Sequence, residues 1–235
     1  MNVAHLFLPG IAALFVLQAT NPVADFQKAR ELASQGDLRG AAALLERSIG
    51  SFPDWGLPYV ELADVLMRSG GDEARQGKAL AEARRLEPQN PRAWVLSARW
   101  FERQGETKLA IEACERALAL REDLTDTRIQ LGLLLVENEP ARAIPHLERA
   151  LTERPDERGV RANLADAYER AGDLEGAERH LRELVRAAPG NAIYARRLAR
   201  FYERAGRPVE AAAVLREAGD AWPERKMRPL LDSAR

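Results

Sequence analysis

The residues best suited to chemistry in this sequence are three histidines and one cysteine. Because Cys114 is the only cysteine, neither an intramolecular disulfide nor a thiolate metal cluster can form. His146 and His180 lie 34 positions apart, and two stacked imidazoles could begin a metal site, but no cysteine or evident carboxylate completes it. The third histidine, His5, stands near the N-terminus. We therefore expect neither a metal ion nor a cofactor.

Sequence signatures of catalysis are also missing. The chain contains no P-loop, no GxGxxG run, no nucleophile elbow and no HExxH motif. The remaining catalytic hypothesis is a carboxylate and arginine site around Arg197, for which the sequence supplies no nucleophile beside a base. We predict that the protein is not an enzyme and that no residue is catalytic.

The composition predicts an all-α protein. Of 235 residues, 46% are hydrophobic, 30% are charged and only 6% are aromatic, and strong helix formers dominate over β-branched residues. The formal net charge is -1, so no overall field attracts nucleic acid or an acidic membrane surface. Basic residues alternate with acidic ones and lack aromatic stacking partners, which argues against a nucleic-acid ligand.

The N-terminus resembles a targeting or anchoring segment. No Asp, Glu, Lys or Arg occurs from Met1 to Ala24, and the apolar run from Leu6 to Leu17 has the length of a signal-peptide core. We predict that residues 1–21 are a signal peptide or an N-terminal membrane anchor, with possible membrane association through residues 1–24. A third possibility is an apolar helix docking on the folded part. The first two predict a periplasmic or cell-envelope location of bacterial type, either soluble after cleavage or anchored.

Turn residues recur at a regular interval along the rest of the chain. In most units a glycine separates two apolar-periodic segments, and a proline follows the second segment. These residues are Gly36, Gly70 or Gly71, Gly105, Gly172 and Gly206, and Pro53, Pro88, Pro155, Pro189 and Pro223. Successive prolines lie 34 or 35 residues apart, with one double gap of 67. This period indicates repeated helical hairpins.

The pattern within each unit resembles the tetratricopeptide repeat. In the sixth unit the matching residues are Leu198, Ala199, Tyr202, Gly206, Ala211, Leu215, Ala218 and Pro223. The resemblance implies an all-α, right-handed superhelical solenoid of about six hairpins. We place the repeats over residues 22–55, 56–90, 91–124, 125–157, 158–191 and 192–225, with 226–235 as a C-terminal tail or cap. Because no unit buries its apolar face alone, we expect one cooperative stack.

Two units depart from this pattern in their turns. The second has one extra residue in Ser69-Gly70-Gly71-Asp72, and the fourth, one residue short, has no glycine in Glu137-Asn138-Glu139-Pro140.

In this family the first helix of each repeat lines a concave groove, which implies a set of partner-binding residues. The middle of the groove would be apolar and the C-terminal part rich in arginine. The predicted residues are Val60, Met67, Val95, Arg99, Ile129, Leu133, Val136, Asn163, Arg196, Arg197 and Arg200. Exposed apolar side chains on such a face favour a bound peptide or helix, and arginines can pair with carboxylates.

Alternatives apply to these same residues. Neighbouring hairpins could cover the apolar positions, and Arg196, Arg200, Glu203 and Arg204 have the spacing to pair with one another along one helix. Of the clamp that some family members use for a C-terminal carboxylate, only Asn163 and Arg197 are present, so we do not predict that clamp. Trp100 is either an exposed anchor or packed between hairpins.

The leading functional hypothesis is a non-enzymatic scaffold that binds a protein or peptide in the groove, in the assembly of a cell-envelope or secreted complex. The alternative is an accessory subunit bound permanently to a membrane complex and tethered by an uncleaved N-terminal helix. A protein or peptide partner is expected in both cases.

Overall fold

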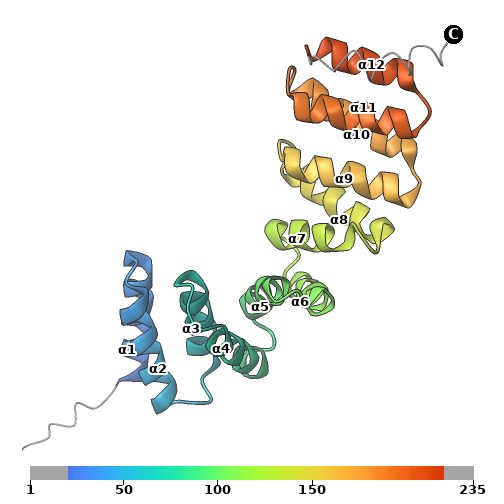
Figure 1. Ribbon diagram of the computed structural model, residues 1–235. Helices are drawn as coiled ribbons and strands as arrows, with labels where there is room; N and C mark the ends of the chain where they lie inside the picture. Colours follow the sequence, from blue (N-terminus) through green and yellow to red (C-terminus); the bar gives the residue numbers. More distant parts are fainter. Residues whose placement is uncertain (1–20, 220–235) are drawn as a thin grey trace, which may run out of the picture. The chain divides into compact units, whose positions relative to one another are not determined.

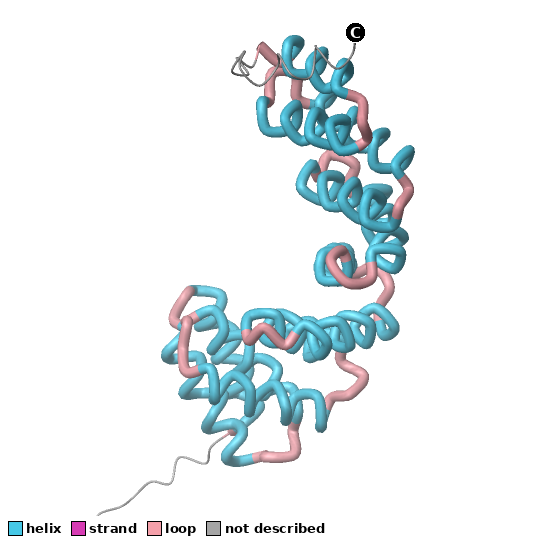
Figure 2. Tube along the Cα trace, turned by 45° about the vertical axis from the view of Figure 1, so that its right-hand side comes forward, coloured by secondary structure: helices cyan, strands magenta, loops and turns pink. Residues whose placement is uncertain are grey.

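The computed structural model describes residues 21–219, which form twelve α-helices without a β-strand in that range (Figures 1 and 2). The helices are α1 (Pro22–Gln35), α2 (Leu38–Ser51), α3 (Gly56–Arg68), α4 (Glu73–Leu86), α5 (Pro91–Arg103), α6 (Thr107–Leu120), α7 (Thr125–Leu135), α8 (Pro140–Glu153), α9 (Arg158–Ala171), α10 (Leu174–Ala187), α11 (Ala192–Arg204) and α12 (Pro208–Glu217). The predicted signal or anchor segment, apart from Asn21, and the predicted tail lie outside the described residues.

Consecutive helices pair into six hairpins, and the all-α class is as the sequence predicts. Each odd-numbered helix is the first of its hairpin, called helix A below, and each even-numbered helix is helix B. The predicted repeats begin at residues 22, 56, 91, 125, 158 and 192, which are the first residues of the six A helices.

The described residues divide into two compact units. Residues 21–87 hold the first two hairpins, and residues 88–219 hold the other four. The division follows α4, a helix whose buried side chains are small or polar apart from Leu80. Within each unit, helix B of one hairpin packs against helix A of the next, as in α2 with α3 and α8 with α9.

Short polar caps determine where the helices begin. The side chains of Asn90 and Asn191 accept hydrogen bonds of 3.0 Å from the backbone amides of Arg92 and Ile193, at the starts of α5 and α11. Between the helices of a hairpin, Gly172 adopts a left-handed backbone with φ of 85°, which ends α9. The next residue, Asp173, then caps α10.

The turn of the fourth repeat uses a different ending. Without a glycine, α7 stops at Leu135 after 11 residues, the shortest helix A of the six. The amide of Glu139 donates to the Leu135 carbonyl at 2.8 Å, and Pro140 opens α8.

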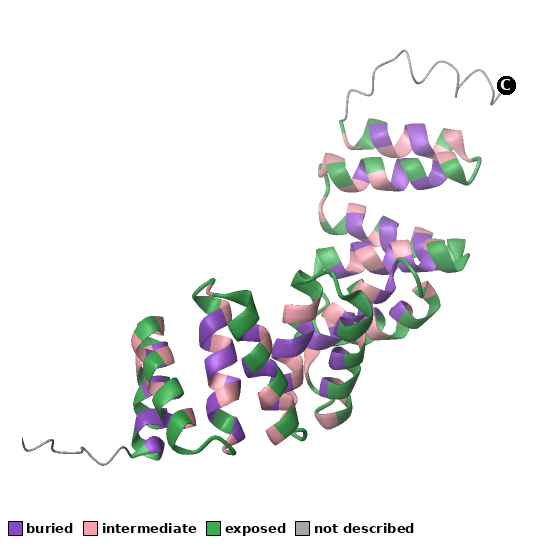
Figure 3. Cartoon of the chain, turned by 60° about the horizontal axis from the view of Figure 1, so that its bottom comes forward, coloured by how far each residue is buried: buried purple, intermediate pink, exposed green. Residues whose placement is uncertain are grey.

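Small residues allow the two helices of a hairpin to approach closely. Gly132 of α7 shows this most clearly, because a Cβ atom there would lie 2.5 Å from Leu147 Cδ2 of α8. Buried alanines and leucines of α5 to α12 form one apolar core in the second unit. Figure 3 shows these buried positions as stripes along the helices.

Candidate functional site

The predicted groove residues fall into three groups by exposure. Val60 and Val136 are buried. The half-buried ones are Met67, Val95, Ile129, Asn163 and Arg197. The exposed ones are Arg99, Leu133, Arg196 and Arg200. Val60 and Met67 belong to the unit 21–87, and the other nine belong to the unit 88–219.

Two of the predicted binding residues need correction. Val60 is 2% exposed and Val136 is 9% exposed, so neither side chain offers a surface to a partner. Val136 is part of the apolar core of the second unit. For these two valines the alternative hypothesis applies, in which neighbouring side chains cover the apolar positions.

Apolar side chains do remain accessible on the A helices of the second unit. Leu133 of α7 is 41% exposed and Ile193 of α11 is 71% exposed. Ile129, one turn before Leu133, packs partly against the core. Ile193 was not among the predicted binding residues, although it begins a stripe that continues to Arg196, Arg197 and Arg200 at helical spacing.

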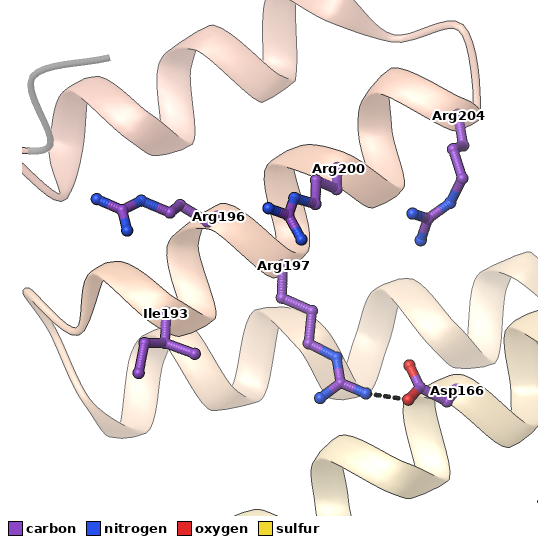
Figure 4. A pocket seen from close by; sticks show the side chains of 6 residues that line it. All are labelled: Asp166, Ile193, Arg196, Arg197, Arg200 and Arg204. Carbon is purple, nitrogen blue, oxygen red and sulfur yellow. Dashed lines mark ion pairs between the residues drawn. The ribbon is translucent and has the colours of Figure 1, made fainter.

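The arginines predicted near the C-terminal end line an open pocket of about 480 Å³ between α9 and α11 (Figure 4). Its lining consists of Asp166, Ile193, Arg196, Arg197, Arg200 and Arg204. The structure therefore brings together three of the predicted residues. Arg204 was not among the predicted binding residues. Its spacing of four from Arg200 places both arginines on the same face of α11, so the sequence could have indicated it.

Two of the four arginines are held against the preceding A helix. Arg197 forms an ion pair with Asp166, and its Nη2 donates a hydrogen bond of 2.7 Å to the Ala162 carbonyl oxygen. Arg204 forms a bidentate pair with Glu169, with Nε to Oε1 at 2.8 Å and Nη2 to Oε2 at 2.9 Å. Arg204 thus pairs between helices and not along α11.

The other two arginines project from the exposed side of α11. Figure 4 shows Arg200 near Arg197, whereas the Arg196 side chain extends away from the Arg197–Asp166 pair, on the side where Ile193 lies. Arg200 forms no ion pair with any residue between 21 and 219. The pocket consequently combines a cationic surface with an exposed aliphatic side chain.

The remaining predicted residues do not join this pocket. Asn163 donates from Nδ2 to the Gly159 carbonyl at 2.8 Å, within its own helix. Arg99 and Val95 lie on α5. Trp100 is half-buried on α5 and makes an edge contact with Phe101, with ring centroids 5.2 Å apart.

Of the side chains considered first for chemistry, His180 and Cys114 are buried, His146 is half-buried, and His5 lies outside the described residues. Burial lowers the pKa of His180, which stacks on the Tyr168 ring at 5.5 Å between centroids. Burial also lowers the pKa of His146 and raises that of the Cys114 thiol to about 12. Within residues 21–219, no group of three His, Cys, Asp or Glu side chains is placed to hold a metal ion.

Comparison with known families agrees with this architecture. Residues 60–124 and residues 134–200 each match a model of the tetratricopeptide repeat, and together they cover more than half of the chain. The chain belongs to the tetratricopeptide repeat family. No curated protein matches the sequence significantly.

Several solved structures share the fold at low sequence identity. YrrB, described as a tetratricopeptide repeat protein with an unusual peptide-binding site, has a TM-score of 0.68 and 20% identity, covering 81% of this chain and 97% of its own. MamA from Desulfovibrio magneticus RS-1 has a TM-score of 0.62 and 20% identity, covering 73% and 96%. PilF from Pseudomonas aeruginosa has a TM-score of 0.59 and 16% identity, covering 91% and 97%.

Proposed function

We propose that this protein is a non-enzymatic interaction scaffold that binds a peptide or protein segment on the A helices of its second unit. The observation that carries the proposal is the open pocket between α9 and α11, where Ile193 is 71% exposed beside Arg196 and Arg200. An accessible aliphatic side chain next to cations is suited to a polypeptide ligand.

The family and fold support this class of function. Repeats of this kind present extended surfaces whose side chains vary while the frame stays constant. The fold shared with YrrB, which is described as having a peptide-binding site, is consistent with a peptide as the ligand. The pocket offers cations and the paired carboxylate of Asp166, without a nucleophile beside a base, so we propose binding and not catalysis.

The location we propose is the cell envelope, where the scaffold would serve the assembly of an envelope or secreted complex. The support is the uncharged stretch from Met1 to Ala24 with its apolar run. None of the helices in residues 21–219 has the length and apolar character needed to cross a bilayer. Measuring the mass of the mature chain tests the leader: loss of about 20 residues indicates export and cleavage.

An intact N-terminus on a membrane-bound protein would instead favour the tethered accessory subunit. The same stretch from Met1 to Ala24 supports this second candidate, because it contains no Asp, Glu, Lys or Arg.

The binding function is tested by selecting peptides from a random display library on the immobilised full-length chain. A double substitution, Leu133→Glu with Ile193→Glu, should abolish recovery of the selected peptides. The matched control is Leu109→Glu with Leu174→Glu, because Leu109 and Leu174 are 40% and 50% exposed on B helices. The proposal fails if no peptide is selected, or if both double variants retain the selected peptides equally.

A further inference from the structure

Exposed apolar side chains gather at one end of the first unit. Val23 in the first turn of α1, Phe52 at the end of α2 and Leu57 at the start of α3 are 48%, 53% and 38% exposed. Within residues 21–87 no other large hydrophobic side chain is exposed, and Trp55, in the loop before α3, is half-buried. We call these four side chains the end patch.

Direct contacts join the three elements that form the end patch. Ser48 Oγ donates a hydrogen bond of 2.9 Å to the Pro22 carbonyl oxygen, which holds the start of α1 against the end of α2. The Trp55 ring packs on Phe26 of α1, with ring centroids 4.8 Å apart. The Trp55 amide donates to the Phe52 carbonyl at 3.2 Å. The end patch is therefore a structured surface at the end of the hairpin where α1 begins.

The sides of the first hairpin are charged, in contrast to this end. Lys28 and Glu31 form an ion pair of 2.8 Å on the surface of α1. On α2, Arg39 is exposed and Glu46 pairs with Arg75 of α4. The exposed large apolar side chains are thus confined to the end of the hairpin and do not continue along it.

The end patch lies where an uncharged stretch joins the fold. Residues 1–20 directly precede α1 in the sequence, contain no Asp, Glu, Lys or Arg, and include the apolar run from Leu6 to Leu17. The few side chains of the end patch cannot cover a run of that length, and the charged sides of the hairpin do not extend the apolar surface. A bilayer can accommodate both, because exposed apolar and aromatic side chains beside an anchor are stable at the lipid–water interface.

The charges around the end patch favour an apolar contact with lipid. Asp54 is exposed in the loop 52–55, which contains no Lys or Arg. Arg47 of α2 is already paired with Asp25 of α1, with Nε to Oδ2 at 2.6 Å. Recognition of anionic headgroups relies on clusters of Lys and Arg. The end patch therefore fits a zwitterionic lipid surface, with Asp54 among the hydrated headgroups.

We propose that the end patch rests on the surface of the bilayer that anchors residues 1–20, with Phe52, Trp55 and Leu57 in the headgroup region and the opposite end of the hairpin in water. This inference rests on the second candidate function, the tethered subunit, and specifies which surface of the folded part faces the membrane. It is independent of the peptide ligand proposed for the second unit.

The test compares the depth of two positions in the full-length chain, reconstituted with its N-terminus intact into phosphatidylcholine vesicles. In a Cys114→Ser background, Gly50→Cys places a fluorescent label near the end patch, where a new Cβ meets no heavy atom within 4 Å. Ser34→Cys places the label at the opposite end of the hairpin, about 18 Å away along the helices. Because each headgroup region is only about 5–8 Å deep, nitroxide-labelled lipid should quench the label at residue 50 at least about twofold more than at residue 34.

Substitution of the end patch provides the second arm. Phe52→Ser with Leu57→Ser removes exposed apolar surface without changing the charge, and should lower the quenching at residue 50 by about half or more. Leu109→Ser with Leu174→Ser makes the same kind of change at side chains 40% and 50% exposed on B helices of the second unit, and should leave the quenching unaltered. The comparison of residues 34 and 50 remains decisive if the end-patch variant perturbs folding.

Equal quenching at residues 34 and 50, or quenching at residue 50 that survives both double variants, would overturn the inference and leave the tether intact. Loss of the quenching when NaCl is raised to about 0.5 M would overturn the apolar contact. A label at residue 50 that is shielded from water before lipid is added would show that residues 1–20 or a second copy of the chain covers the end patch instead. Failure of the chain to sediment with the vesicles would overturn the tethered subunit together with this inference.

Discussion

Arg197 of α11 donates a hydrogen bond of 2.7 Å to the carbonyl oxygen of Ala162 in α9, which precedes it by 35 positions. The same relationship occurs in the first unit, where Arg68 Nη2 donates to the Ala33 carbonyl at 2.9 Å, also 35 positions earlier. Because the separation is about one repeat, an arginine of one A helix binds the backbone of the previous A helix. These contacts hold neighbouring A helices together in the region of the predicted binding residues.

Replacing Arg197 should therefore affect stability more than replacing Arg200. Arg197→Ala removes a hydrogen bond to a helix carbonyl and the ion pair with Asp166, and we expect a loss of about 1–2 kcal/mol in the free energy of unfolding. Arg200→Ala removes no described ion pair and should change it by less than about 0.5 kcal/mol. Urea denaturation followed by circular dichroism measures both. Equal destabilisation by the two variants would contradict the conclusion that Arg197 holds α11 against α9.

Close contact between α7 and α8 predicts opposite effects for two glycines. In Gly132→Ala the new Cβ would lie 2.5 Å from Cδ2 and 2.7 Å from Cγ of Leu147, a fully buried side chain. We expect destabilisation of about 1–3 kcal/mol from overpacking. Gly159 of α9 has no heavy atom within 4 Å of the equivalent Cβ position.

Gly159→Ala should consequently stabilise the protein by up to about 0.5–1 kcal/mol, because alanine restricts the unfolded chain and favours the helix. Chemical denaturation of the two variants beside the unsubstituted protein measures the difference. Stabilisation by both substitutions would show that Leu147 can move away from residue 132 without loss of stability.

The hairpins were predictable because their signals are local. Pro91 and Pro140 each open a helix, Asn90 caps one, and Gly172 ends one, so the period is visible in the residues themselves. The start and end of each helix depend on these few side chains and on the spacing of its apolar residues.

The exposure of the predicted binding residues could not be read from the sequence in the same way. Leu133 lies near the end of α7 and Val136 directly follows the last residue of that helix, yet one is 41% exposed and the other 9%. The difference depends on side chains from other helices packed around the site. Likewise, the sequence does not distinguish Arg197 from Arg200. Their roles differ because Ala162 and Asp166, on a different helix, lie within reach of Arg197.

His180 should make stability depend on pH in the neutral range. It is 9% exposed, neither ring nitrogen has a hydrogen-bond partner within residues 21–219, and burial lowers its pKa below the ordinary value of 6.5. The unfolded chain therefore binds this proton at a higher pH than the folded chain. Stability is retained above about pH 6.5 and decreases as the pH falls below it, by at most about 1.4 kcal/mol per pH unit.

His180→Phe keeps an aromatic ring against Tyr168 and removes the proton-binding group. Between about pH 7.5 and pH 5.5, the free energy of unfolding of this variant should vary less than that of the unsubstituted protein. Glu183 and Glu148 raise the pKa of His180, whereas Arg179 and Arg161 lower it, and burial exceeds each of them. Identical pH profiles for the two proteins would exclude His180 as the titrating group.

Cys114 should be unreactive while the second unit is folded. The thiol is buried in α6 and burial raises its pKa to about 12, so almost no thiolate is present at neutral or mildly alkaline pH. We expect alkylation by iodoacetamide near pH 8 to be slower than that of a free thiol by on the order of a thousandfold. Addition of urea above the unfolding midpoint should restore the rate.

The control combines Cys114→Ser with Ala119→Cys, which places a thiol at an exposed position of the same helix and should react rapidly without urea. Rapid alkylation of Cys114 in the native protein would show that α6 opens well below the global unfolding free energy.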